Sequence, residues 1–175
     1  KNTAIGRLAL NANTTGQSNT AIGADALPNN TIGSQNIAIG TDALANNTTG
    51  SRNIAIGTSA LLNQSFNNGG NSWNSDNVAI GFEALRDNQS DSPHSGRANT
   101  AIGSEALRSN YLGSLNTAVG RSSLRDLDHG SYNVAIGALA MPGLLEGYNN
   151  TAVGEGTLVG VVFGNNNTVI GNGSG

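Results

Sequence analysis

Asn36-Ile37-Ala38-Ile39-Gly40 is one copy of a five-residue block that recurs ten times along the 175-residue chain. The asparagine that opens each copy stands at Asn2, Asn19, Asn36, Asn53, Asn77, Asn99, Asn116, Asn133, Asn150 and Asn167. Successive copies are 17 residues apart, except for two intervals of 24 and 22 residues. A fixed period of this length, without helical periodicity, predicts a repeat protein of ten units with two insertions.

Each position of the unit accepts few residue types. Position 2 is Thr, Ile or Val, position 3 is Ala in nine copies, position 4 is Ile or Val, and position 5 is always Gly. β-branched residues that alternate with a small residue and end at a glycine are typical of a short strand followed by a bend. Position 9 is Leu in eight of the nine complete units, and a second glycine closes most units.

This pattern predicts an all-β fold: a parallel β-solenoid, or β-roll, of ten coils of about 17 residues. Identical residues of neighbouring coils would stack in ladders ~4.8 Å apart, including a ladder of the position-1 asparagines. We expect a single solenoid domain over residues 1–171, with loop insertions at 62–76 and 86–98. Residues 172–175 are expected to form a flexible tail or linker.

The core that the repeat predicts is thin. Positions 4 and 9 would supply its large apolar side chains, which leaves the alanine row of position 3 on the back of the strand. Because that row could be buried only against another chain, we expect the coils to be intertwined as a homotrimer. The edge formed by positions 12–14 also becomes apolar toward the C terminus, at residues 111–112, 127, 144–145 and 161–163. A neighbouring chain, the insertions or a following domain could cover it, and of these we expect a neighbouring chain.

Composition excludes several classes of function. The net charge of −3 gives no basic surface for nucleic acid, and no apolar run is long enough for membrane insertion by this segment. The chain has no cysteine, and its two histidines lie in different coils, so we expect no metal site and no cofactor. Asp76, Asp87 and Asp91 of the two loops could supply the paired carboxylates of a polysaccharide-cleaving enzyme, but loop acids are usually only solvating, and we do not expect an enzyme.

The two insertions fall at the same phase of adjacent coils and should lie on one edge of the solenoid. They contain four candidate ligand-binding residues: Phe66, Trp73, His94 and Arg97. Aromatic rings among amides and hydroxyls suit a glycan, because a ring stacks on a sugar face while amides bond the sugar hydroxyls. The alternative is that Phe66 and Trp73 only pack the loops onto the coils.

Arg86, Arg108 and Arg125 occupy position 10 of three successive coils, so they should form an arginine ladder on one edge. They are further candidates for ligand binding, as an anion site for sialic acid, uronate or phosphate. The alternative is a solvated salt ladder, since Asp87 and Asp126 directly follow two of the arginines.

The block Asn-Thr-Ala-Ile-Gly resembles the core strand of head repeats in trimeric autotransporter adhesins. The longer unit from Asn36 to Gly50 is similar to the shafts of bacterial and phage tail-fibre-like proteins, and the resemblance covers Asn2 to Gly171. It implies parallel β-rolls assembled as a homotrimer. It also implies an extracellular location, at a cell surface or in a virion tail fibre.

Together these observations predict the head or tip of a trimeric surface fibre. It would adhere to a cell-surface glycan or another surface receptor through loops on a rigid β-roll. One alternative is a structural shaft segment without a ligand of its own. A second alternative is an ice-binding solenoid, although Ile or Val replaces Thr at position 2 in four of the ten coils.

Overall fold

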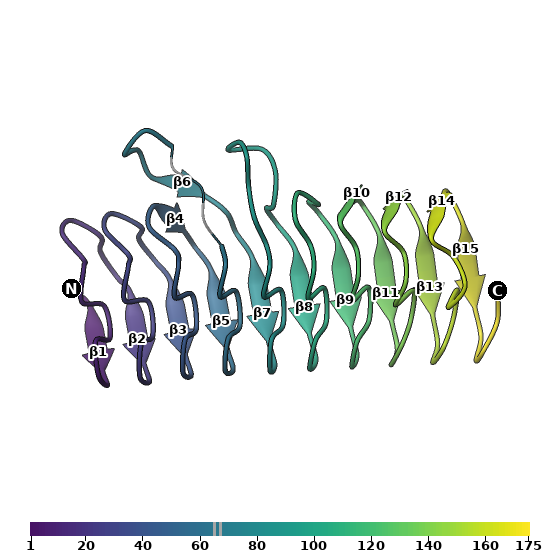
Figure 1. Cartoon of the computed structure of the whole chain (residues 1–175), viewed down its shortest axis with the longest axis horizontal. Coiled ribbons are helices and arrows are strands. Elements are labelled where there is room, and N and C mark those ends of the chain that lie inside the picture. The colour runs from purple at the N-terminus through teal and green to yellow at the C-terminus, as the bar shows by residue number, and fades with distance from the viewer. Residues whose placement is uncertain (65, 67) are drawn as a thin grey trace.

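The computed structural model describes residues 1–64, 66 and 68–175, which form a row of stacked β coils without any helix (Figure 1). One strand from each coil joins a ten-stranded parallel sheet. Its strands, in spatial order, are β1 (Thr3–Ile5), β2 (Thr20–Ile22), β3 (Ile37–Ile39), β5 (Ile54–Ile56), β7 (Val78–Ile80), β8 (Thr100–Ile102), β9 (Thr117–Val119), β11 (Val134–Ile136), β13 (Thr151–Val153) and β15 (Thr168–Ile170). Equivalent residues pair in register, as Ala38 does with Ala55. The predicted parallel β-solenoid is confirmed.

Five further strands lie on the opposite side of the coils, at the top of Figure 1. A two-stranded sheet pairs β4 (Gly50–Ser51) with β6 (Trp73–Asn74), and a three-stranded sheet joins β10 (His129–Ser131), β12 (Glu146–Tyr148) and β14 (Phe163–Asn165). Both sheets are parallel. The insertions of the fourth and fifth coils rise from this same side (Figure 1).

The face of the strand that carries position 3 points into the core, and the face that carries positions 2 and 4 points outward, which is the reverse of the expected arrangement. The position-3 alanines from Ala21 to Ala152 are fully buried inside a single chain, where they pack with the alanines and leucines of positions 8 and 9. The residues of positions 2 and 4 point outward, and Ile102 and Ile136 remain 38% and 41% exposed. The prediction that position 4 fills the core, and that the alanine row needs a second chain, is therefore wrong. The interior of so short a coil is narrow, and alanine leaves room there for the leucine of the opposite wall.

Each coil turns by means of left-handed backbone at fixed positions. Gly120, at position 5, has φ 128°, and a Cβ there would lie 2.5 Å from the carbonyl oxygen of Gly137 in the next coil. Leu124, at position 9 of the same coil, also has a positive φ of 46° and is fully buried. A left-handed leucine costs about 1–2 kcal/mol, which burial of its side chain offsets.

Two ladders of buried amides connect the coils. In the first, at position 1, the backbone N–H of Asn36 donates to Asn19 Oδ1 at 2.9 Å, while Asn36 Nδ2 donates to the carbonyl oxygen of Gly50 at 2.9 Å. Equivalent bonds recur along the chain up to Asn167, which confirms the predicted asparagine ladder. The side chain of Asn36 thus bonds to its own coil through Gly50 and to the following coil through the backbone N–H of Asn53.

The second ladder, at position 12, changes its chemistry part of the way along the chain. It runs through asparagines and Gln64 as far as Asn110, whose Nδ2 donates to Asn88 Oδ1 at 2.7 Å. Leu127 and Leu144 then take this position and are fully buried within their own chain. Leu127 and Leu144 therefore need no covering chain. Leu145, Val162 and Phe163 on the same edge are 40%, 42% and 66% exposed, so burial of that edge by a neighbouring chain stays a prediction. Asn110 Oδ1 is left buried without a hydrogen-bond partner, since Leu127 stands where the next amide donor would be.

Candidate functional site

The two insertions lie side by side at their bases, because adjacent coils bring them together. Asn88 Nδ2 lies 3.4 Å from Gln64 Oε1, and the backbone N–H of Ala98 donates to the carbonyl oxygen of Ser75 at 2.8 Å. The chain leaves the regular coil after position 12, at Gln64 and at Asn88, and both residues keep their side chains in the buried ladder. The loops therefore extend from a fixed base.

Trp73 packs the first loop onto the solenoid. It is only 6% exposed, and its ring lies edge-on to Phe66, with 5.6 Å between centroids and 88° between planes. The backbone of Trp73, in β6, pairs with that of Gly50, in β4 of the preceding coil. Phe66 is half-buried. In this arrangement the Trp73 ring has little free face for a sugar, and the packing alternative describes it better than ligand binding does.

The second loop presents its two candidates to solvent. His94 and Arg97 are both exposed. The loop around them is held by Ser95, whose Oγ donates to Asp91 Oδ1 at 2.7 Å, and by Ser114, whose Oγ donates to the His94 carbonyl oxygen at 3.3 Å. A polar ligand could thus reach His94 and Arg97 without a rearrangement of the loop.

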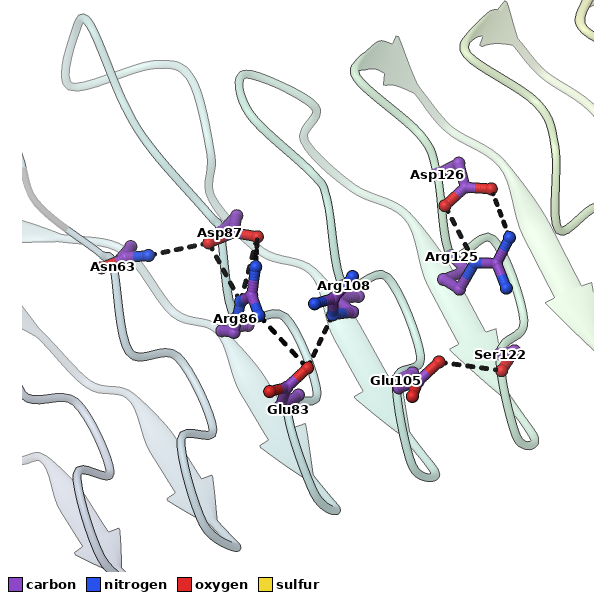
Figure 2. Close-up of polar contacts among 9 residues, drawn as sticks. All are labelled: Asn63, Glu83, Arg86, Asp87, Glu105, Arg108, Ser122, Arg125 and Asp126. Atoms are coloured by element: carbon purple, nitrogen blue, oxygen red, sulfur yellow. Dashed lines mark hydrogen bonds and ion pairs between the residues drawn. The ribbon is translucent and has the colours of Figure 1, made fainter.

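The three position-10 arginines lie along one edge, but each has a carboxylate partner (Figure 2). Arg86 donates to Asp87, with Nη2 at 2.7 Å from Oδ2, and to Glu83. Arg108 Nε donates to the same Glu83 carboxylate at 2.6 Å. Arg125 forms a two-bond pair with Asp126, at 2.9 and 2.7 Å.

These ion pairs determine the net charge of the arginine edge. Hydrogen bonding to Asp87 raises the pKa of Arg86, and hydrogen bonding to Asp126 raises the pKa of Arg125. Arg86 and Arg108 are balanced by two carboxylates, so their cluster has no net positive charge. The geometry favours the salt ladder over an anion site.

A set of exposed rings on the C-terminal coils was not among the sequence-derived candidates. Tyr111, Tyr132, Tyr148 and Phe163 are 42%, 58%, 48% and 66% exposed. We call these four residues the aromatic edge. They fall at positions 13, 17, 16 and 14 of their units, so they form no column in the repeat. The available signal was that all three tyrosines of the chain lie in the last five positions of a unit.

Within residues 1–64, 66 and 68–175, no group of three or more His, Cys, Asp or Glu side chains could hold a metal ion. The same residues include no helix of the length and hydropathy needed to cross a bilayer. Comparison of the chain with protein-family models, curated proteins and solved structures finds no match. The class that the fold defines is the parallel β-solenoid, and its function has to be argued from its surfaces.

Proposed function

We propose that this chain is a stiff segment of an extracellular surface fibre, in which three copies associate through the outward face of the ten-stranded sheet. We call the residues of positions 2 and 4 on this sheet the ladder face. Every residue of the ladder face is Thr, Ile or Val. The single observation that supports the proposal is that this uncharged face points away from the core of its own chain.

An exposed surface of this composition favours association. Monomeric soluble proteins rarely leave a large continuous apolar patch in water, and the ladder face runs along all ten coils, a length of ~45 Å. Equivalent side chains repeat in register from coil to coil. Parallel copies would thus meet with matching side chains at each level, as a closed symmetric assembly requires.

Stiffness follows from the same repetition. Each coil is bonded to the next by the ten-stranded sheet and by buried side-chain amides, so bending would have to break several hydrogen bonds at one level. A rod of this kind suits a fibre segment that holds a binding site away from a surface.

The mass of the protein in solution tests the assembly. We expect light scattering after size exclusion to give three times the 17.6 kDa of one chain. Replacing Ile80 and Ile102, at the centre of the ladder face, with lysine should give the single-chain mass with an unchanged circular dichroism spectrum. The matched control places lysine at Asn29 and Asn46, which are exposed at position 11 of two coils, and should stay trimeric.

Two results of the mass measurement would contradict the proposal. A wild-type protein at 17.6 kDa would refute the trimer. The ladder face would then be free to contact ice, and measurement of thermal hysteresis would test the ice-binding alternative. A lysine variant that keeps the trimeric mass would show that association uses another surface.

Adhesion to a cell-surface glycan or another receptor is the second candidate function, supported by the solvent exposure of His94 and Arg97 on a fixed loop base. Three copies in a fibre would add avidity to weak single sites. Replacing residues 89–95 with Thr-Thr restores the 17-residue unit of the first coil, where Thr14 and Thr15 follow Asn13. This variant should keep its thermal stability and lose binding to target cells. Unchanged cell binding would place the adhesive site outside residues 89–95.

A further inference from the structure

The aromatic edge has no explanation in the fold. Tyr132 stands at position 17 with φ 63°, where Ser18 and Gln35 adopt the same left-handed backbone. A bulky residue is unfavourable in that conformation, and Tyr132 is 58% exposed, so burial does not compensate. Tyr148 stands at position 16, which is occupied by the small residue Ser34 in the second coil. Folding alone therefore does not require these rings.

The three-stranded sheet arranges its outward side chains in two rows, which include Tyr148 and Phe163 of the aromatic edge, while Tyr132 directly follows β10 and Tyr111 lies one coil earlier. One row holds His129, Glu146 and Phe163, and the other holds Ser131, Tyr148 and Asn165, each in register across β10, β12 and β14. The glycines between the two rows, Gly130 and Gly147, are buried. Neighbouring side chains within a row are ~4.8 Å apart. This spacing is similar to the length of one sugar unit, so a sugar chain lying along the solenoid axis would meet one coil per unit.

The charged residues near the aromatic edge favour a neutral ligand over an anionic one. Positions 13–17 of the sixth to ninth coils contain Asp128 and Glu146 but no Lys or Arg. Carboxylates accept hydrogen bonds from sugar hydroxyls and repel anionic sugars, while the exposed amides of Asn149 and Asn166 can both donate and accept. Aromatic rings supply flat apolar faces for the C–H faces of sugars.

From these observations we propose that the aromatic edge binds a neutral polysaccharide chain that runs along the solenoid axis. The site goes beyond the proposed assembly, because it lies on a different side of the coils from the ladder face and is complete in a single chain. The edge also differs from a surface for self-association. Its residues change from one coil to the next and mix rings with carboxylates and amides, whereas the ladder face repeats.

The test uses cellohexaose and chitohexaose as neutral probes and hexagalacturonate as an anionic probe, titrated into the whole chain by calorimetry. We expect binding of at least one neutral probe and none of the anionic probe. The double variant Tyr132→Ser, Tyr148→Ser should weaken binding about tenfold or more. This variant should fold, because serine already occupies both positions in other coils, at Ser18 and Ser34.

The matched control is Phe82→Thr, which removes another exposed ring at a position where Thr41 and Thr58 stand in earlier coils. It should bind the neutral probe like the wild type. The inference would be overturned if the wild type bound neither neutral probe, or if it bound hexagalacturonate as tightly as a neutral probe. It would also be overturned if the tyrosine variant bound the neutral probe as tightly as the wild type. Light scattering on the same samples separates this inference from the proposed assembly. A tyrosine variant that loses its oligomeric mass would identify the edge as a contact between chains and would also overturn it.

Discussion

Replacing Asn133 with alanine removes one member of the position-1 ladder at a place where its contacts are well defined. Asn133 is fully buried, and its Nδ2 donates to the Gly147 carbonyl oxygen at 2.8 Å. Its Oδ1 accepts the backbone N–H of Asn150 at 3.0 Å. Asn150 Nδ2 also donates to this oxygen, but it keeps a second bond to the Gly164 carbonyl oxygen at 2.7 Å.

The cost follows from what the substitution leaves unpaired. The backbone N–H of Asn150 would lose its acceptor in a residue only 1% exposed, where water cannot replace that acceptor. A buried unpaired donor costs ~1–3 kcal/mol, and the lost bond to Gly147 adds ~1 kcal/mol. We therefore expect Asn133→Ala to lower the free energy of unfolding by about 3 kcal/mol.

Urea unfolding at a fixed protein concentration measures this loss, since association would make stability depend on concentration. Native-state amide exchange adds a local measurement, because the Asn150 N–H should exchange faster than its neighbours in the ladder. The matched control is Asn46→Ala, which removes an exposed amide that donates to Asn63 Oδ1 at 2.8 Å. If Asn133→Ala costs no more than Asn46→Ala, the asparagine ladder does not stabilise the stack of coils.

Three smaller predictions concern the turn, the end of the second ladder and the arginine edge. Gly120→Ala should lower stability by about 2 kcal/mol or more, visible in thermal unfolding, because its Cβ would meet Gly137 in a left-handed backbone. Leu127→Asn offers a donor to the unpaired Asn110 Oδ1, so in urea unfolding it should cost less than Leu127→Ala, for which we expect ~3 kcal/mol. Arg86→Gln should cost under ~1 kcal/mol, and 1 M salt should reduce that difference further if the arginine edge is a solvated salt ladder.

The period of the sequence predicts the order and register of the coils, because every unit places the same residues at the same height. It does not predict which side of the strand faces inward. Ile37 and Ile39 are larger and more apolar than Ala38, and alternation alone says only that they share a face. The deciding factor is the width of the coil, which depends on how Leu44 fills it from the opposite wall.

The sequence predicts where the two loops lie, but it does not predict how the candidate residues in them are packed. The length of the insertions places both loops on one edge, and this follows from the repeat alone. The burial of Trp73 depends on the surface of the preceding coil, where Gly50 and Thr49 receive it, and no local pattern reveals that surface. The aromatic edge was not predicted as a binding site because its four rings stand at four different unit positions and form no column in the repeat.

The change at position 12 links the interior of the solenoid to its outer surface. In the second, third and sixth coils, the asparagine at this position donates to the carbonyl oxygen of the glycine three residues later, which fixes a tight turn there. Leucine cannot make that bond, and from Leu127 onward positions 14–16 form the strands β10, β12 and β14, whereas in the third coil the short strand β4 forms beside the Asn47 bond. An extended strand directs alternate side chains outward. The change from asparagine to leucine thus coincides with the three-stranded sheet on which Tyr148 and Phe163 lie, whereas Tyr111 and Tyr132 fall outside that sheet.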